Sequence, residues 1–104
     1  MSVVTSETVA PGIVRIAINR PDKRNAVNPE ARGALIEAVS AALTDEAVAA
    51  IVLGSTDGHF CAGGDIDSMV DLDVGSARIR MKENHRLVRL LAEAEKPLVA
   101  AVEG

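Results

Sequence analysis

Three short apolar segments in the chain predict β-strands. In residues 13–18 the large apolar side chains of Val14, Ile16 and Ile18 alternate with Arg15 and Ala17, which is the period of a strand with one buried face. Residues 50–53 and 98–102 are continuously apolar, which is typical of strands buried on both faces of a parallel sheet. We therefore expect these three segments to pair in one sheet.

A helix is predicted between the first two of these strands. Asn28 can cap the free N–H groups of a helix start, and Pro29 suits the first helical position, where a missing N–H costs nothing. Apolar side chains then recur every four residues, which predicts a buried stripe on a helix that runs to about Leu43. The stripe consists of Ala31, Leu35, Val39 and Leu43.

A longer helix is predicted before the last strand. Ser76 is the expected N-cap, and the helix stops before Pro97 because the residue preceding a proline is pushed out of helical angles. The helix is expected to run through Ile79, Glu83, Leu87, Leu90, Leu91 and Ala94. The charged positions expected to face solvent are Arg78, Arg80, Lys82, His85, Arg86 and Arg89.

The order of these elements indicates an α/β fold with a largely parallel sheet and right-handed crossovers. No internal repeat or linker divides residues 1–104, so we expect a single domain. The sequence stops directly after a strand, whereas α/β proteins place their binding loops at the carboxyl ends of strands. We therefore expect these residues to be the N-terminal portion of a larger domain.

Composition narrows the function classes. The 104 residues are 48% hydrophobic and 25% charged, with one Phe, no Tyr and no Trp, so the core must be aliphatic and disorder is not expected. No apolar run approaches the roughly 20 residues of a membrane span, and residues 1–8 contain no recognisable targeting segment. With a single cysteine, Cys61, these features favour a cytoplasmic protein.

The net charge of −4 is unevenly distributed along the chain. Residues 33–77 contain eight acidic and no basic side chains, while the segments on either side each carry a net charge of +2. Nucleic acid would meet a mixed surface with no row of aromatic side chains for stacking, so nucleic acid binding is not expected. A small anionic ligand held at one basic loop remains open, because it needs only two or three local charges.

Two loops carry the candidate chemistry. Residues 19–28 (NRPDKRNAVN) turn at Pro21 and expose a basic segment. Residues 54–65 (GSTDGHFCAGGD) contain four glycines, and Gly63 and Gly64 allow the backbone to approach a ligand closely. Free N–H groups in such a loop can stabilise negative charge on a thioester oxygen, although a tight turn without any ligand has the same spacing.

These loops resemble those of the enoyl-CoA hydratase/isomerase (crotonase) superfamily. The resemblance spans about residues 13–104 and implies a crotonase-like fold, in which ββα units repeat in a spiral and of which only the N-terminal portion is present. The matching stretches follow one another in the family's order and are residues 19–28, 59–66 (HFCAGGDI) and 96–104 (KPLVAAVEG).

The resemblance also implies roles for individual residues. It places a coenzyme A site at the loop that contains Asn25, with the side chains of Lys23 and Arg24 near phosphates and the backbone around Ala26 at the adenine. It makes the backbone N–H of Gly64 the first of two oxyanion-hole donors to the thioester oxygen. The other substrate-binding positions that it implies are Ala62, Asp65 and Ile66.

The reaction itself is implied only for an intact enzyme. In the family the second oxyanion glycine and, in hydratases, two catalytic glutamates follow the position of Gly104. Addition of water to a 2,3-enoyl-CoA is the expected reaction, with isomerisation and the other reactions of the superfamily left open. No metal is implied, and no cofactor beyond the coenzyme A of the substrate.

The resemblance also bears on the oligomeric state, and one alternative to an enzyme remains. Family members are usually trimers or dimers of trimers, so the resemblance implies a homo-oligomer, a trimer or hexamer. The rival is a non-catalytic module of 104 residues that binds coenzyme A esters or packs against a partner subunit.

Other polar clusters have plainer explanations. Asp57, His59 and Cys61 alternate in a short loop, and such side chains need not converge on a nucleophile or a metal. The acidic residues that follow resemble a calcium loop only in number, because Met69 stands where a third ligand is required. A solvated acidic face is expected from Asp65, Asp67, Asp71 and Asp73.

Overall fold

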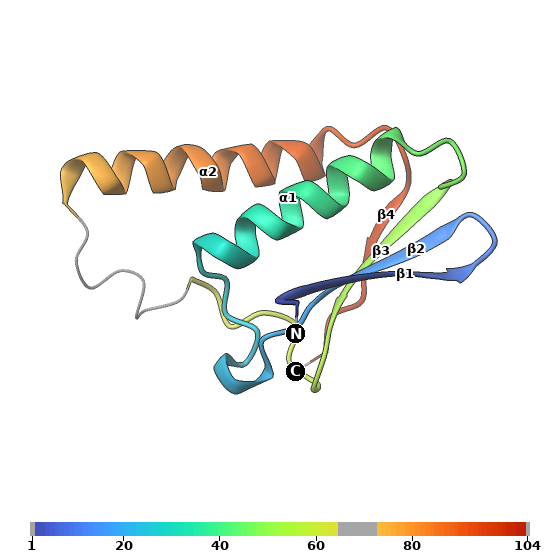
Figure 1. Cartoon of the computed structure of the whole chain (residues 1–104), viewed down its shortest axis with the longest axis horizontal. Helices are drawn as coiled ribbons and strands as arrows, with labels where there is room; N and C mark the ends of the chain where they lie inside the picture. The colour runs from blue at the N-terminus through green and yellow to red at the C-terminus, as the bar shows by residue number, and fades with distance from the viewer. Residues whose placement is uncertain (1, 65–72, 104) are drawn as a thin grey trace.

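The computed structural model describes residues 2–64 and 73–103 as a mixed α/β fold (Figure 1), as the order of predicted elements indicates. Within these described residues, no helix combines the length and the apolar character of a membrane span. The elements in chain order are β1 (Val4–Ala10), β2 (Ile13–Ile18), the 3-10 turn η1 (Pro21–Lys23), α1 (Pro29–Thr44), β3 (Ala50–Ser55), α2 (Val74–Ala92) and β4 (Leu98–Ala100).

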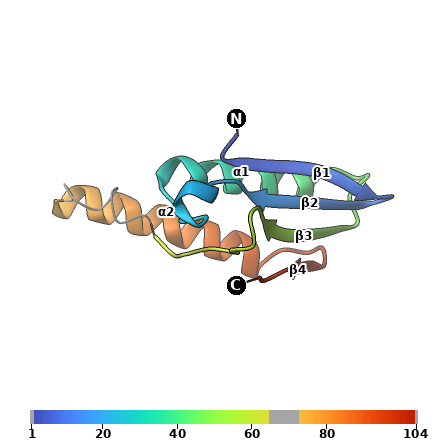
Figure 2. The same ribbon diagram turned by 90° about the horizontal axis from the view of Figure 1, so that it is seen from below.

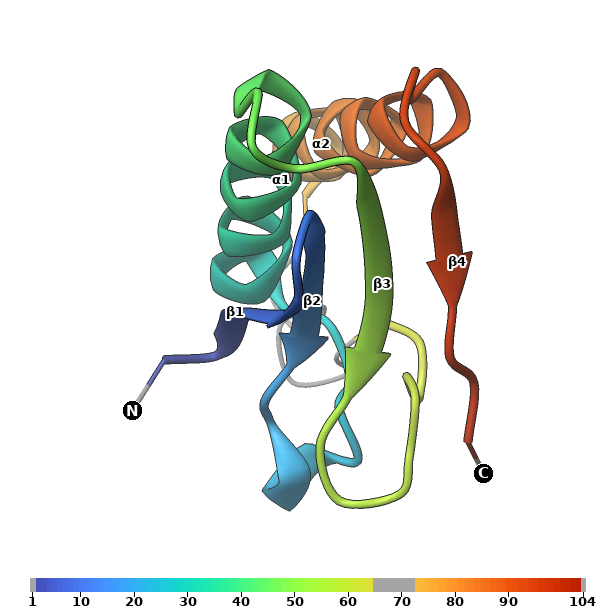
Figure 3. The ribbon, with the colours of Figure 1, turned by 90° about the vertical axis from the view of Figure 1, so that its right-hand side faces the viewer.

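The strands form one sheet in the order β1-β2-β3-β4. β1 pairs with β2 in an antiparallel manner, whereas β2, β3 and β4 are parallel to one another. The carboxyl ends of the three parallel strands therefore meet at one edge of the sheet, which lies at the bottom of Figure 3. Helices α1 and α2, which connect these strands, pack against each other on one side of the sheet.

The core lies between α1 and the central strands β2 and β3. Ile16, Val39 and Ile51 have no exposed surface. They are joined in one buried cluster by Ile18, Leu35, Ala42, Val48 and Leu53. The stripe predicted on α1 therefore packs against the predicted strands, and this burial of aliphatic surface is the main driving force for the fold.

Helix α1 begins and ends close to the predicted positions. The Oδ1 atom of Asn28 accepts a hydrogen bond from the N–H of Ala31 at 2.8 Å, and Pro29 is the first helical residue. At the other end, the Nζ atom of Lys96 donates to the carbonyls of Ala42 (2.9 Å) and Asp45 (2.7 Å). These bonds satisfy carbonyls that a helix end leaves without partners.

Strand β1 is absent from the pattern-based prediction. Its five central residues are exposed, so it has no apolar face that periodicity could reveal. It forms because Pro11 and Gly12 turn the chain back onto β2, with Gly12 at a φ of 76° that favours glycine.

Helix α2 differs from the prediction at its start and in its burial. Its N-cap is Asp73, whose Oδ1 atom accepts from the N–H of Ser76 at 2.7 Å, so the expectation that Ser76 caps the helix is wrong. No residue of α2 is buried, and Ile79 is 66% exposed. The N-terminal half of α2 extends beyond α1 and the sheet (Figure 2). Only the later part contacts the core, through the half-buried Leu87, Leu90 and Leu91.

Strand β4 is shorter and more exposed than its apolar sequence predicts. It ends at Ala100 instead of Val102, and Val99 is exposed. The expectation of a strand buried on both faces is therefore wrong for this segment. The physical reason is its position: in the described part of the chain, no strand pairs with the outer edge of β4.

Candidate functional site

Three loops leave the carboxyl ends of the parallel strands and meet at one edge of the sheet (Figure 3). We call residues 20–26, after β2, the basic loop, and residues 56–64, after β3, the glycine loop. The third segment, residues 101–103, follows β4. In open α/β sheets, ligands bind in this position.

The basic loop is closed by hydrogen bonds between its own ends. The N–H of Asn25 donates to the carbonyl of Arg20 at 2.8 Å, and the Nη1 atom of Arg20 donates to the carbonyl of Ala26 at 2.6 Å. The N–H of Ala26 also donates to the carbonyl of Lys23 at 3.0 Å. This preformed loop exposes Lys23 and Arg24, whereas Ala26 is 8% exposed and makes both of its backbone hydrogen bonds inside the loop.

Asn25 faces the protein interior. It has no exposed surface and a φ of 59°, a left-handed conformation that asparagine tolerates better than most residues. Its Oδ1 atom accepts from the N–H of Arg20 at 2.7 Å. Its Nδ2 atom donates to the carbonyls of Thr56 and His59, both at 2.6 Å. The side chain of Asn25 is therefore fully occupied: its N–H groups join the basic loop to the glycine loop, and its oxygen accepts within the basic loop.

The glycine loop lies beside the residue that follows the basic loop. The N–H of Val27 donates to the carbonyl of Gly63 at 2.8 Å, within a parallel bridge between Val27 and Gly64. Gly63 has a φ of 95°, which favours glycine strongly. Because the C=O of Gly63 and the N–H of Gly64 belong to one trans peptide, they point in opposite directions. The N–H of Gly64 is thus directed away from Val27, on an exposed part of the loop.

The third segment holds the glycine loop from its other side. The N–H of Phe60 donates to the carbonyl of Glu103 at 2.9 Å. The N–H of Ala101 donates to the carbonyl of Leu53 at 2.8 Å, so the exit of β4 stays parallel to β3. The stretches that suggested a family resemblance are thus brought together, with residues 59–66 bonded to both of the other two through His59, Phe60 and Gly63.

Of the three remaining site residues predicted from the sequence, the structure describes one. Ala62 lies exposed on the glycine loop, two residues before Gly64. Asp65 and Ile66 lie outside the described residues.

Of the alternative clusters suggested by the sequence, Cys61 and Asp73 have local roles, whereas Asp67 and Asp71 lie outside the described residues. The Sγ atom of Cys61 accepts from the N–H of Gly63 at 3.4 Å, within its own loop. Asp73 is engaged as the N-cap of α2. Over residues 2–64 and 73–103, no three His, Cys, Asp or Glu side chains are arranged to hold a metal ion.

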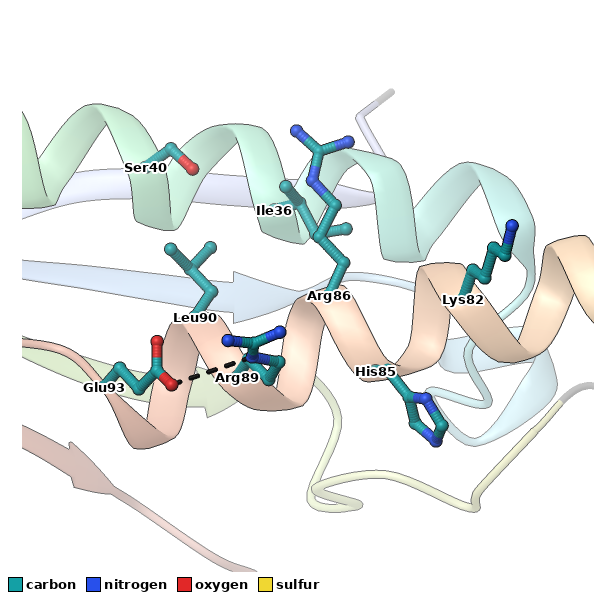
Figure 4. Close-up of a pocket in the computed structure, with 8 residues that line it drawn as sticks. All are labelled: Ile36, Ser40, Lys82, His85, Arg86, Arg89, Leu90 and Glu93. Carbon is teal, nitrogen blue, oxygen red and sulfur yellow. Dashed lines mark ion pairs between the residues drawn. The ribbon is translucent and has the colours of Figure 1, made fainter.

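A shallow groove of 540 Å³ lies apart from the three loops, between α1 and α2 (Figure 4). Its apolar floor is formed by Ile36 and Leu90 and its rim by charged side chains, among which Arg89 and Glu93 form an exposed ion pair at 3.7 Å. Apart from Glu93, its charged lining comes from α2 positions expected to face solvent, and none of its lining residues belongs to the three loops at the strand ends.

Arg32 is a buried polar residue that sequence reasoning missed. It lies in the first turns of α1 and is 4% exposed, and its Nη1 atom donates to the Oδ1 atom of Asn84 on α2 at 2.8 Å. Burial lowers the pKa of the Arg32 guanidinium, the charge of Arg80 acts in the same direction, and Glu83 opposes both. No local signal distinguishes such an arginine from one on a helix surface, because its partner lies 52 residues along the chain.

The sequence of the chain is similar to those of known proteins. A family model described as Enoyl-CoA hydratase/isomerase matches residues 8–104. The chain is 34% identical over 106 residues to Enoyl-CoA delta isomerase 2 of Homo sapiens, covering 98% of this chain and 26% of the relative. It is 39% identical over 88 residues to Crotonyl-CoA hydratase of Syntrophomonas wolfei, covering 84% of this chain and 34% of the relative.

Solved structures show the same fold. AtuE of Pseudomonas aeruginosa superimposes with a TM-score of 0.91 at 36% identity, covering 98% of this chain and 40% of AtuE. An enoyl-CoA hydratase of Bacillus anthracis superimposes with a TM-score of 0.93 at 17% identity, also over 98% of this chain and 40% of the other, and this likeness concerns the fold alone. The chain thus spans between a quarter and two fifths of the length of these proteins. The resemblance seen in the sequence and the crotonase-like fold expected from it are both confirmed.

Proposed function

The chain belongs to the enoyl-CoA hydratase/isomerase family, and on that premise we propose that it forms the part of an acyl-CoA-processing enzyme that binds the coenzyme A thioester. The observation that carries the proposal is the joining of the basic loop to the glycine loop, through Asn25 and through the Val27–Gly63 hydrogen bond. One loop offers cations and the other an exposed backbone N–H, which are the two groups that an acyl-CoA ester requires.

The basic loop is proposed to bind the phosphates of coenzyme A. Lys23 and Arg24 are exposed on a loop closed by its own hydrogen bonds, so the backbone that carries them requires little ordering when an anion binds. Ala26 lies beside them, and its carbonyl retains a second lone pair that a ligand N–H can use. These features support the loop as the end of the site that receives the nucleotide.

The glycine loop is proposed to bind the thioester. The hydrogen bond from Val27 to Gly63 turns the next N–H, that of Gly64, away from the protein's own backbone. An N–H donor fixed in this way can stabilise the negative charge that develops on the thioester oxygen, and one such donor contributes about 3–4 kcal/mol to catalysis. Ala62, Asp65 and Ile66 are proposed to flank the substrate.

Hydration of a 2,3-enoyl-CoA is the proposed reaction of the whole protein. In this reaction water adds across the double bond while the polarised thioester holds the resulting enolate charge. Isomerisation is the neighbouring alternative, since one relative is an isomerase and another a hydratase. Neither reaction needs a cofactor other than the coenzyme A of the substrate, and the acid and base groups are proposed to follow residue 104.

Self-association as a trimer or hexamer is also proposed. Its support in this chain is the exposed apolar edge at β4, where Val99 and Val102 are 60% and 67% exposed. Sedimentation equilibrium tests it, because a monomer at all concentrations would contradict the proposal.

Calorimetric titration with coenzyme A at low and high ionic strength tests the proposed ligand. Lys23→Ala should raise the Kd by about twofold to fivefold at low salt, the effect of about 0.5–1 kcal/mol for one exposed charge pair. The difference should shrink at high salt, where charges are screened. Lys82→Ala, an equal charge change on exposed α2, is the control and should leave the Kd unchanged.

Two results would contradict the proposal. The first is an absence of coenzyme A binding by the wild-type chain. The second is an equal loss of affinity in both lysine variants, because that would indicate attraction by net charge alone. Hydration activity is tested separately, by following the loss of conjugated enoyl-thioester absorbance with crotonyl-CoA. Because the acid and base groups are proposed to follow residue 104, this assay uses the whole protein, and binding without turnover there would favour a non-catalytic role.

A further inference from the structure

We propose that Asn25 is a positioning residue that sets the distance and angle between the basic loop and the glycine loop, an inference that rests on the proposed function. Asn25 itself has no exposed surface and cannot touch a ligand while the loops stay closed. Its effect on a ligand is therefore exerted through the two loops that its side chain joins.

The basic loop and the glycine loop are attached to each other at several points. At residue 27 the chain is held by the bond from the Val27 N–H to the Gly63 carbonyl. The N–H of Thr56 also donates to the carbonyl of Ile18 at 3.0 Å, so the residues on either side of the basic loop are bonded to the glycine loop. The two bonds from Asn25 Nδ2 to the carbonyls of Thr56 and His59 attach the glycine loop from within the basic loop itself. They therefore limit movement of the basic loop between its two flanks relative to the glycine loop.

The hydrogen-bonding capacity of the amide fits this task. An asparagine side chain offers two N–H donors and one oxygen acceptor, and here the donors take two carbonyls while the oxygen takes the N–H of Arg20. Aspartate would place a carboxylate oxygen against the Thr56 and His59 carbonyls, where both groups are acceptors. The buried position would also remove the water that could relieve this repulsion.

The consequence for binding follows from the length of the ligand. An acyl-CoA that has its phosphates at Lys23 and Arg24 and its thioester at Gly64 must span both loops at once. The free energy of bridging two subsites depends on their spacing being correct before the ligand arrives. Loosening the loops should therefore weaken the binding of coenzyme A even in protein that is fully folded.

Three variants separate this role from a purely structural one. Asn25→Gly accepts the φ of 59° but loses all three side-chain bonds, and Asn25→Asp keeps only the acceptor. Asn28→Asp is the matched control, because it adds the same charge nearby while keeping the oxygen that caps α1. The Kd for coenzyme A is measured at temperatures where each variant is folded, and amide hydrogen exchange is measured without ligand.

The expected result is a rise in Kd of about tenfold or more for Asn25→Gly, an effect of about 1.4 kcal/mol, with Asn28→Asp close to wild type. Exchange at the Val27 amide should accelerate, while the Ile51 amide, bonded to the Pro97 carbonyl in the sheet, should keep its wild-type rate. If Asn25→Asp does not fold, Asn25→Gly still decides the question.

Two outcomes overturn the inference, and each is distinct. A wild-type Kd in a folded Asn25→Gly variant would show that Asn25 supports only stability. Equal acceleration at Val27 and Ile51 would show global unfolding instead of loosening of the loops. If the wild-type chain binds no coenzyme A, the proposed function has failed, which the control titration reveals before any variant is compared.

Discussion

The guanidinium of Arg32 on α1 donates from Nη1 to the Oδ1 atom of Asn84 on α2 at 2.8 Å, and Arg32 is almost fully buried. This hydrogen bond crosses an interface to which α2 contributes no buried residue. The neutral amide therefore holds a charged group at the contact between the two helices. Removal of the Asn84 amide would leave the buried Arg32 cation without this acceptor. The resulting loss of folding free energy is larger than the net contribution of the hydrogen bond itself.

Asn84→Ala should destabilise the protein by about 1–3 kcal/mol, because the Arg32 guanidinium would lose its acceptor in a buried position. Arg32→Met removes the charge but keeps an unbranched apolar side chain in the same space, so its cost should be smaller. Urea unfolding of both variants and of the double variant measures the two effects. If Arg32→Met lowers the free energy of unfolding more than Asn84→Ala does, the explanation based on an unpaired buried charge is wrong.

Two glycine-to-alanine substitutions should change stability in opposite directions. A Cβ atom at Gly33 or at Gly63 would meet no atom within 4 Å, so crowding is not the cause in either case. Gly33 lies inside α1, where alanine should stabilise by about 0.5–1 kcal/mol. Gly63 has a φ of 95°, where alanine is strained and should destabilise by about 1 kcal/mol or more. Thermal unfolding of the pair checks the signs, and two shifts of the same sign would contradict the assignment.

The stability of α2 should depend on the ionisation of Asp73. Hydrogen bonds from Ser76 lower the pKa of the Asp73 carboxyl below its usual value. A group whose pKa falls on folding stabilises the native state above its unfolded pKa and loses that contribution as the pH falls through the folded pKa. Asp73→Ala should therefore lower the Tm at neutral pH, and the difference from wild type should shrink in strong acid.

Asp73→Asn is the control for this prediction. Asparagine keeps an oxygen that can accept from the N–H of Ser76 but cannot ionise. Its contribution to α2 should consequently be independent of pH in the acid range. Helical circular dichroism at a series of pH values follows both variants. A constant difference between Asp73→Ala and wild type down to strong acid would contradict the role of the carboxylate charge.

Replacing Gly64 with Pro should strongly reduce turnover of an enoyl-CoA by the whole protein, because proline has no N–H to donate. Loss of one such donor lowers turnover by about 100- to 1,000-fold. Proline also constrains the residue before it, Gly63, so Gly64→Ala, which keeps the N–H, is needed beside it. Undiminished turnover in Gly64→Pro, or an equal loss in Gly64→Ala, would refute the role of this N–H.

The sequence was sufficient to predict those helices and strands whose start or burial is encoded in neighbouring residues. Asn28 and Pro29 mark the start of α1, and the apolar runs at residues 13–18 and 50–53 became β2 and β3. Prediction from the sequence failed where the conformation of a segment depends on other parts of the fold. β1 has no buried face of its own, and the cap of α2 is Asp73 because that carboxylate, and not Ser76, receives the first free N–H groups.

The same division holds for the candidate site. Spacing and resemblance identified the two loops and their order, since these are properties of the chain itself. They could not distinguish Asn25 from its neighbours Lys23 and Arg24, because its burial arises from carbonyls 31 and 34 residues further along the chain. The burial of Arg32 against Asn84 was invisible for the same reason.

The long separation between Asn25 and its carbonyl partners also orders the events of folding. Bringing such distant residues together costs chain entropy, which is recovered only after β2 and β3 have paired and α1, which connects them along the chain, has packed against the sheet. The binding surface should consequently be the last part of the fold to assemble and the first to open. A ligand that spans both loops would bind only after they have closed, and would therefore lower the population of molecules in which they are open. The rate of proteolysis at these loops should then fall as the ligand concentration rises.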